Sequence, residues 1–269
     1  MADADAQKVD GGNTGGEGSE GADGVARPEV RTILCIPGVW KDRTAAVQQI
    51  AKLSGGYLFA GDTLTHMESK QSIEMELCEP DERMARAFAA AGPHWRDTPE
   101  MERIATHGKV AYLVGQGGSA DRAKAMMQAG AALLYAGGLG VKVESSGLAF
   151  SPAQWIRMTD NCWLGALHQA YVVYVEGGSD DADTFSCGMH NLGMPDAIVE
   201  SRLSENPVEL LRVFTAYLCI EAPDLRPSHT FSVEDGAPRY RVSREEDVPY
   251  PDPEDLFHNP YGMWRLKLA

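Results

Sequence analysis

The chain has 269 residues, of which 43% are hydrophobic and 23% charged, so it is long enough to fold around one or two hydrophobic cores. Its formal charge of −15 disfavours nucleic acid and anionic lipid as partners, because proteins that bind polyanions cluster lysine and arginine. No stretch approaches the roughly 20 apolar residues that cross a bilayer, and the N-terminus lacks the pattern of a signal peptide. We therefore expect a cytoplasmic protein without nucleic-acid or membrane partners.

The charge is concentrated in two short segments. Residues 1–28 are rich in glycine and acidic residues and hold almost no large apolar side chain, which predicts a disordered tail. Residues 1–29 and 243–257 each have a formal charge of −5, two-thirds of the total together. The exclusion of nucleic acid thus rests on the absence of a basic cluster.

Strands and helices are predicted to alternate along the chain. A strand at 32–36 ends at Pro37-Gly38, and Asp42 caps a helix at 43–53 whose apolar residues recur at helical spacing. The same signals predict strands at 57–60 and 72–77, helices at 83–91 and from 98, an apolar strand at 110–114, an Ala-rich helix at 119–136 and a strand at 139–144. We then expect a helix from 151, strands at 171–175 and 184–189, a helix at 208–220 and a hairpin at 230–243.

This order predicts an α/β (α+β) fold of two packed ferredoxin-like βαββαβ halves. The first uses strands near 33, 57, 72 and 110 with helices near 45 and 85. The second uses strands near 140, 171, 185 and 230 with helices near 155 and 212, and the Ala-rich helix joins the two. The corresponding ranges are 29–108, 109–243 and a C-terminal segment at 244–269. The alternative is one mixed sheet with a Rossmann-like βαβ unit that starts at Val110.

The cysteines are an odd number without CxxC pairs, and four of them lie in apolar or strand-like runs. Buried thiols are therefore predicted rather than a disulfide scaffold. The histidines lack the spacings of metal ligands, so no metal site is predicted. The five cysteines are Cys35, Cys78, Cys162, Cys187 and Cys219.

A glycine-rich turn between the apolar strand and the Ala-rich helix resembles a dinucleotide fingerprint. Such glycines let backbone N–H groups approach a pyrophosphate, and an acidic residue after the next strand takes the ribose. An ordinary tight turn is the preferred interpretation, because glycine is common there for steric reasons alone, and no cofactor is predicted. The candidate nucleotide-binding residues are Gly115, Gly117, Gly118, Ser119 and Glu144.

The stretch from Cys187 to Asn191, with Asp196 close behind, gathers a thiol, an imidazole, an amide and a carboxylate. A thiol nucleophile needs an imidazole within hydrogen-bond reach of the sulfur. Cys187 and His190 are candidate catalytic residues, but they are only three residues apart, whereas such partners usually come from distant segments. A buried cysteine beside a turn histidine is the preferred interpretation.

Residues 255–266 are dense in aromatic side chains, which exposed chain ends rarely retain. We predict that this segment docks onto the fold. The alternative is a strap that binds a partner.

Several stretches carry a family resemblance that spans most of residues 31–268. They are Ile36-Pro37-Gly38-Val39-Trp40, residues 55–61, 111–119 and 141–147, Ser151-Pro152, residues 186–195, His229-Thr230-Phe231 and residues 255–266. On these stretches the chain resembles a bacterial family known as domain of unknown function 4261. The resemblance implies one integrated protein and brings no activity, cofactor or catalytic residue with it.

The sequence contains no recognisable catalytic triad, metal cluster or P-loop. This favours a non-enzymatic role and leaves open whether the protein is an enzyme. The leading hypothesis is a binding or regulatory protein that acts on a protein or small molecule through a cleft between its halves. One alternative is a nucleotide-dependent enzyme that uses the turn at Gly115–Ala120. Another is an immunity or stress protein that neutralises a partner.

Overall fold

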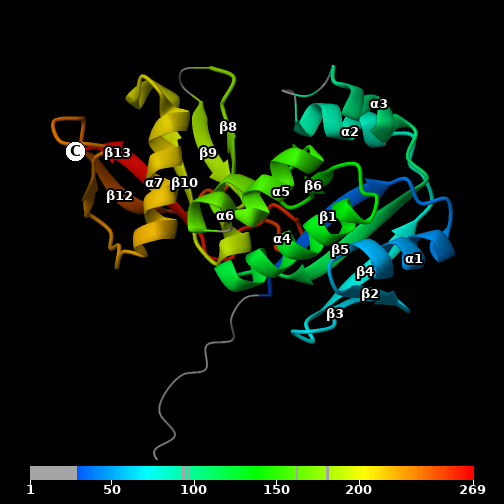
Figure 1. Cartoon of the computed structure of the whole chain (residues 1–269). Helices are drawn as coiled ribbons and strands as arrows, with labels where there is room; N and C mark the ends of the chain where they lie inside the picture. The colour runs from blue at the N-terminus through cyan, green and yellow to red at the C-terminus, as the bar shows by residue number, and fades with distance from the viewer. Residues whose placement is uncertain (1–28, 93–94, 96, 162, 180–181) are drawn as a thin grey trace, which may run out of the picture.

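The computed structural model describes residues 29–92, 95, 97–161, 163–179 and 182–269 (Figure 1). They form two β-sheets with helices packed on and between them, which confirms the predicted α+β class. The predicted tail at 1–28 and Cys162 lie outside these residues. Within the described ranges, no helix has the length and apolar character needed to span a bilayer.

The first sheet has seven strands, and every neighbouring pair is antiparallel. Strand β1 lies inside the sheet between β5 and β6, and its residues are almost all apolar because both of its faces are covered. In sheet order the strands are β2 (Tyr57–Ala60), β3 (Thr63–His66), β4 (Ser72–Cys78), β5 (Lys109–Gln116), β1 (Arg31–Gly38), β6 (Val141–Val143) and β7 (Leu148–Phe150).

Six elements of this half follow the path of a ferredoxin-like unit. Strand β1, helix α1 (Arg43–Leu53) and strand β4 form a βαβ unit split by β5, and β5, helix α4 (Ala120–Tyr135) and β6 form a second one split by β1. Helices α1 and α4 pack against each other. The Ala-rich helix, expected to join two halves, is thus the second helix of the first unit.

The remaining elements of the first half are additions to that unit. The β2–β3 hairpin extends one edge of the sheet, where a strand of the unit itself was expected. Helices α2 (Met84–Ala91) and α3 (Pro99–Ala105) cover the opposite face from α4, in a smaller core around Cys35 and Phe88. The helix near 85 is therefore an insertion between β4 and β5.

The first sheet continues to Phe150, beyond the boundary expected near residue 108. Strands β5 and β6 are parallel, but antiparallel β1 lies between them. They therefore do not form the adjacent parallel pair of a Rossmann-like unit starting at Val110.

The second sheet has six strands and one parallel pair, β10 with β13, at its centre. This parallel pair replaces the all-antiparallel ferredoxin-like order expected for the second half. The end of the aromatic C-terminal segment forms β13, a central strand of the sheet. In sheet order the strands are β11 (Thr230–Phe231), β12 (Tyr240–Glu245), β13 (Met263–Leu268), β10 (Asp196–Glu200), β9 (Asp183–Cys187) and β8 (Val173–Val175).

Helices fill the space between the two sheets (Figure 1). Helix α7 (Pro207–Glu221) packs on β8, β9 and β10, and α6 (Leu164–Tyr171) packs on α7 and α4. Tyr171, expected to begin a strand, instead ends α6. Helix α5 (Pro152–Asp160) begins at the predicted Ser151, whose side chain forms a capping box. Two short 3₁₀ helices, η2 (Met189–Leu192) and η3 (Ser201–Leu203), flank β10.

Aromatic residues attach the middle helices to α4. The Trp155 indole donates to the Met127 carbonyl at 3.0 Å, and the Tyr171 hydroxyl donates to the Ala123 carbonyl at 2.8 Å. A Cβ on Gly130 would lie 3.0 Å from the Trp155 Nε1, so the small residues of α4 allow this close approach. One large hydrophobic core therefore extends from the first sheet through α4 to the second.

The position of β13 predicts different costs for two leucines on one strand. Leu266 is fully buried, whereas Leu268 is 52% exposed. We expect Leu266→Ala to lower the free energy of unfolding by about 2–5 kcal/mol and Leu268→Ala to change it by less than about 0.5 kcal/mol. Urea denaturation of both variants measures this, and equal losses would contradict the central position of the strand.

Candidate functional site

The glycine-rich turn after β5 is packed against the second half. The Gly117 N–H donates to the Val30 carbonyl at 2.8 Å, and the Gly118 N–H donates to the Asn191 carbonyl at 3.1 Å. The Ser119 hydroxyl caps α4 by accepting from the Arg122 N–H. These amides are therefore already bonded within the protein, and the turn has the geometry of a tight strand-to-helix connection.

Close contact with η2 explains why glycine is needed here. Gly118 has a φ of +82°, which side-chain-bearing residues rarely adopt. A Cβ on Gly193, which follows η2, would lie 2.4 Å from the Gly118 carbonyl oxygen. The Gly115 position is filled in the same way by the Met126 sulfur, 2.3 Å from where a Cβ would be. The glycines thus bring two backbones together.

Glu144 lies on the other face of the first sheet. It forms an ion pair with Lys142, which is paired with Cys35 across the sheet, whereas α4 covers the face that carries Leu34 and Val143. The structure does not bring Glu144 to the glycine-rich turn. The candidate nucleotide-binding residues thus belong to two separate places.

Cys187 and His190 are close in the sequence but make different contacts. The Cys187 thiol faces the Phe257 carbonyl at 3.9 Å, and burial raises its pKa, with Asp196 and Asp255 adding to the rise. Its thiol is therefore protonated at neutral pH. Among the described residues no hydrogen bond joins the thiol to His190, so the arrangement lacks the contact that activates a nucleophile.

Asn191 is fully buried and holds four segments together. Its Oδ1 accepts from the hydroxyls of Thr32 at 2.7 Å and Ser145 at 2.9 Å, and its Nδ2 donates to the Gly188 carbonyl at 2.9 Å. Its own carbonyl accepts from Gly118. The amide, which the sequence placed beside the candidate thiol and imidazole, therefore joins β1, the turn after β6, the glycine-rich turn and η2.

Asp196 joins the strand before it, η2 and the C-terminal segment, as Asn191 joins the other segments of the site. Its carboxylate accepts from the Ser186 hydroxyl at 2.8 Å, the Met189 N–H at 3.3 Å and the Asn259 side-chain amide at 2.6 Å. Burial raises the pKa of Asp196 to about 6, although these hydrogen bonds oppose the rise. Asn259 also donates to the Met194 carbonyl at 3.0 Å.

Residues 246–262, between β12 and β13, are named the strap here. An aromatic cluster holds the strap against β9: Tyr250 contacts Phe185 and Phe257 with ring centroids 6.1 and 5.1 Å apart. The His258 Nδ1 lies 2.8 Å from the Tyr250 carbonyl, which closes the strap on itself. The terminal segment is evident in the sequence, but the partners of Asn259 are not, since they lie more than sixty residues away.

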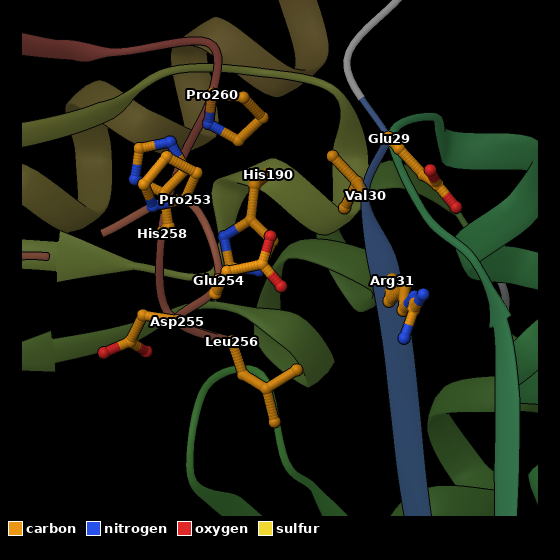
Figure 2. Close-up of a pocket in the computed structure, with 10 residues that line it drawn as sticks. All are labelled: Glu29, Val30, Arg31, His190, Pro253, Glu254, Asp255, Leu256, His258 and Pro260. Atoms are coloured by element: carbon orange, nitrogen blue, oxygen red, sulfur yellow. The ribbon is translucent and has the colours of Figure 1, made fainter. Parts of the chain in front are cut away.

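A groove of about 330 Å³ lies where the strap, the start of β1 and η2 meet (Figure 2). It is bordered by elements of both halves, and we name it the strap groove. Its lining residues are Glu29, Val30, Arg31, His190, Pro253, Glu254, Asp255, Leu256, His258 and Pro260.

His190 is the buried polar residue of the strap groove. It is 1% exposed, and its Nδ1 has no hydrogen-bond partner. Burial lowers the pKa of His190 to about 4, and nearby His258 contributes, so the imidazole is neutral at pH 7. A buried polar group without a partner costs about 1–3 kcal/mol, which marks this atom as one that a ligand could satisfy.

In the part of the chain that the structure describes, no three His, Cys, Asp or Glu side chains are grouped so that they could hold a metal ion. Cys35, Cys187 and Cys219 are buried free thiols, as predicted, whereas Cys78 is only half-buried.

Comparison with family models, curated proteins and solved structures finds no match to the chain. The resemblance to domain of unknown function 4261 therefore stays a prediction. The geometry defines a class of site: a groove between two α/β halves, with a buried ring nitrogen that has no hydrogen-bond partner and with an acidic border.

The Asn191 network predicts unequal costs for its members. Asn191→Ala leaves two hydroxyls and one carbonyl without their partner, so we expect the free energy of unfolding to fall by more than about 2 kcal/mol. Thr32→Val removes one donor while Ser145 still serves the Asn191 oxygen, and we expect a loss of about 1 kcal/mol. Chemical denaturation of the two variants tests this. Equal losses in the free energy of unfolding would show that the network does not depend on Asn191 more than on Thr32.

Asp196 predicts a pH-dependent contribution to stability. Its folded pKa of about 6 lies above the ordinary aspartate value of 3.8, so the folded state binds more protons between these pH values. The stabilisation is therefore present at low pH and is lost as the pH rises through about 6. Relative to Asp196→Asn, the wild type should gain about 1.4 kcal/mol per unit as the pH falls from 6 toward 4.

Denaturation of both proteins between pH 4 and 7 measures this difference, in which the contributions of the histidines largely cancel. An NMR titration of the Asp196 carboxyl carbon in the wild type provides the same information without a variant. A constant difference, together with a titration near pH 4, would refute the assignment.

Proposed function

We propose that the protein is a cytosolic, non-enzymatic binding or regulatory protein whose partner occupies the strap groove. The observation that carries this proposal is the His190 Nδ1, a buried ring nitrogen without a hydrogen-bond partner in a groove bordered by both halves. Grooves of this kind, in which few polar groups converge at a junction, are typical binding sites. The strap forms one wall and is held by the Asp196–Asn259 hydrogen bond, so its position is defined before a partner arrives.

The non-enzymatic role is supported by the contacts of the candidate catalytic groups. The Cys187 thiol is protonated and contacts the strap backbone rather than His190. The alternative of a nucleotide-dependent enzyme depends on amides that already donate to Val30 and Asn191, and on Glu144, which faces elsewhere. It therefore has less support than binding.

The other alternative, an immunity or stress protein that neutralises a partner, uses the same groove. Five acidic residues of the strap are exposed, and they would attract a basic partner electrostatically. The exposed acids are Glu246, Asp247, Asp252, Glu254 and Asp255.

Site-specific photo-crosslinking tests the proposal. A photoreactive amino acid at Leu256, on the border of the groove, should capture a discrete partner in cells that produce the protein. Val233 is the matched control, because both side chains are 40% exposed and Val233 lies outside the groove. We expect the Leu256 position to capture the partner at least about tenfold more efficiently, as measured by mass spectrometry.

The same experiment on an Asn191→Ala background should lose the product, because the groove loses its buried support. Products at Leu256 that match those at Val233 in identity and amount would refute the strap groove as the binding site.

A further inference from the structure

The hydrogen bonds around Asn191 determine which nitrogen of His190 carries the proton. The Asn191 oxygen accepts from two hydroxyls and its nitrogen donates to a carbonyl, so the orientation of the amide is unambiguous. That nitrogen lies 3.5 Å from the His190 Nε2. Since an amide nitrogen can only donate, Nε2 acts as the acceptor and the proton of the neutral ring is on Nδ1.

The strap groove therefore contains a fixed N–H donor that needs an acceptor. His190 is 1% exposed, and it lines the groove together with the strap residue Glu254 (Figure 2). A carbonyl oxygen fits this donor, because the neutral ring offers a hydrogen bond without a charge. The ligand must therefore present an oxygen acceptor.

The border of the groove selects a positive charge next to that acceptor. The groove is lined by three acidic residues, Glu29, Glu254 and Asp255, and by one arginine, Arg31. Within the described residues the Glu254 carboxylate forms no ion pair and is exposed, so it is free to turn toward an incoming cation. Leu256 and the neighbouring prolines supply an apolar surface for the stem of a lysine or arginine.

We propose that the strap groove binds a basic peptide segment of a partner, with one peptide carbonyl accepting from the His190 Nδ1 and a lysine or arginine side chain against Glu254 and Asp255. This inference rests on the proposed function and specifies its partner. One peptide residue supplies the carbonyl acceptor and its neighbour supplies the cation. A segment of this size fits a groove of about 330 Å³.

A defined probe tests the inference on the full chain. The blocked peptide Ac-Gly-Gly-Lys-Arg-Gly-Gly-NH2 should bind in low-salt buffer, and the same peptide with two glutamates in place of Lys-Arg should not. Titration calorimetry and NMR spectra of ¹⁵N-labelled protein measure the affinity. Loss of binding as the salt concentration rises is expected, because the attraction is between partly exposed charges.

Charge variants within the strap separate local contact from general attraction. The double variant Glu254→Gln/Asp255→Asn should weaken binding about tenfold, because two ion pairs are lost. The matched control Glu246→Gln/Asp247→Asn removes the same charge from exposed strap positions that do not line the groove, and it should weaken binding less than about twofold. All four positions are exposed, so folding is retained in both variants.

The ¹⁵N signals of His190 provide a readout of the acceptor. We expect a protonated Nδ1 in the free protein and a shift of this signal when the basic peptide binds. A protonated Nε2, an unchanged signal, equal losses in the two double variants, or equal affinity for the acidic peptide would each overturn the inference.

The crosslinking experiment distinguishes this inference from the proposed function. If the segment captured at Leu256 contains no lysine or arginine, the basic-peptide inference fails while the groove remains a binding site. If Leu256 captures nothing beyond the Val233 control, the proposed function itself fails.

Discussion

The buried amide of Asn191 is the constraint on which the rest of the site depends. It is fully enclosed, and each of its polar atoms must find a partner inside the protein because water cannot reach it. Its partners come from β1, the turn after β6 and the start of η2, so satisfying one side chain fixes the relative positions of both halves. The same amide also sets the protonated nitrogen of the neighbouring imidazole.

Local signals in the sequence were sufficient for many elements and insufficient for others. Helix α1 has the predicted bounds because the Asp42 cap and the apolar spacing are both within one segment. The run at 171–175 was predicted as a strand, yet Tyr171 ends a helix, because a short apolar run does not distinguish the two. Strands β10 and β13 are stabilised by pairing with each other. The residues next to either strand in the sequence do not indicate which strand it pairs with.

The segments of the candidate site were identified from the sequence, whereas their roles were not. Three of the segments singled out from the sequence meet in space: residues 115–119, 187–196 and 255–266. Each contains the small or polar residues that a buried junction requires. Cys187 and Glu144 were named as candidates, with a structural interpretation preferred for each, and the side chains that organise the junction are Asn191 and Asp196. Their partners Thr32 and Asn259 are distant along the chain, and a single sequence does not reveal such pairings.

The parallel pairing of β10 with β13 has a consequence for how the second half folds. Asp196 lies opposite Met263, so this contact closes a loop of more than sixty residues, whereas β8–β9 and β11–β12 are local hairpins. The strap is the last part of that loop, and its groove does not exist until the loop has closed. A molecule bound in the groove would contact both η2 and the strap, which this loop joins, so its binding would stabilise the folded state and slow unfolding.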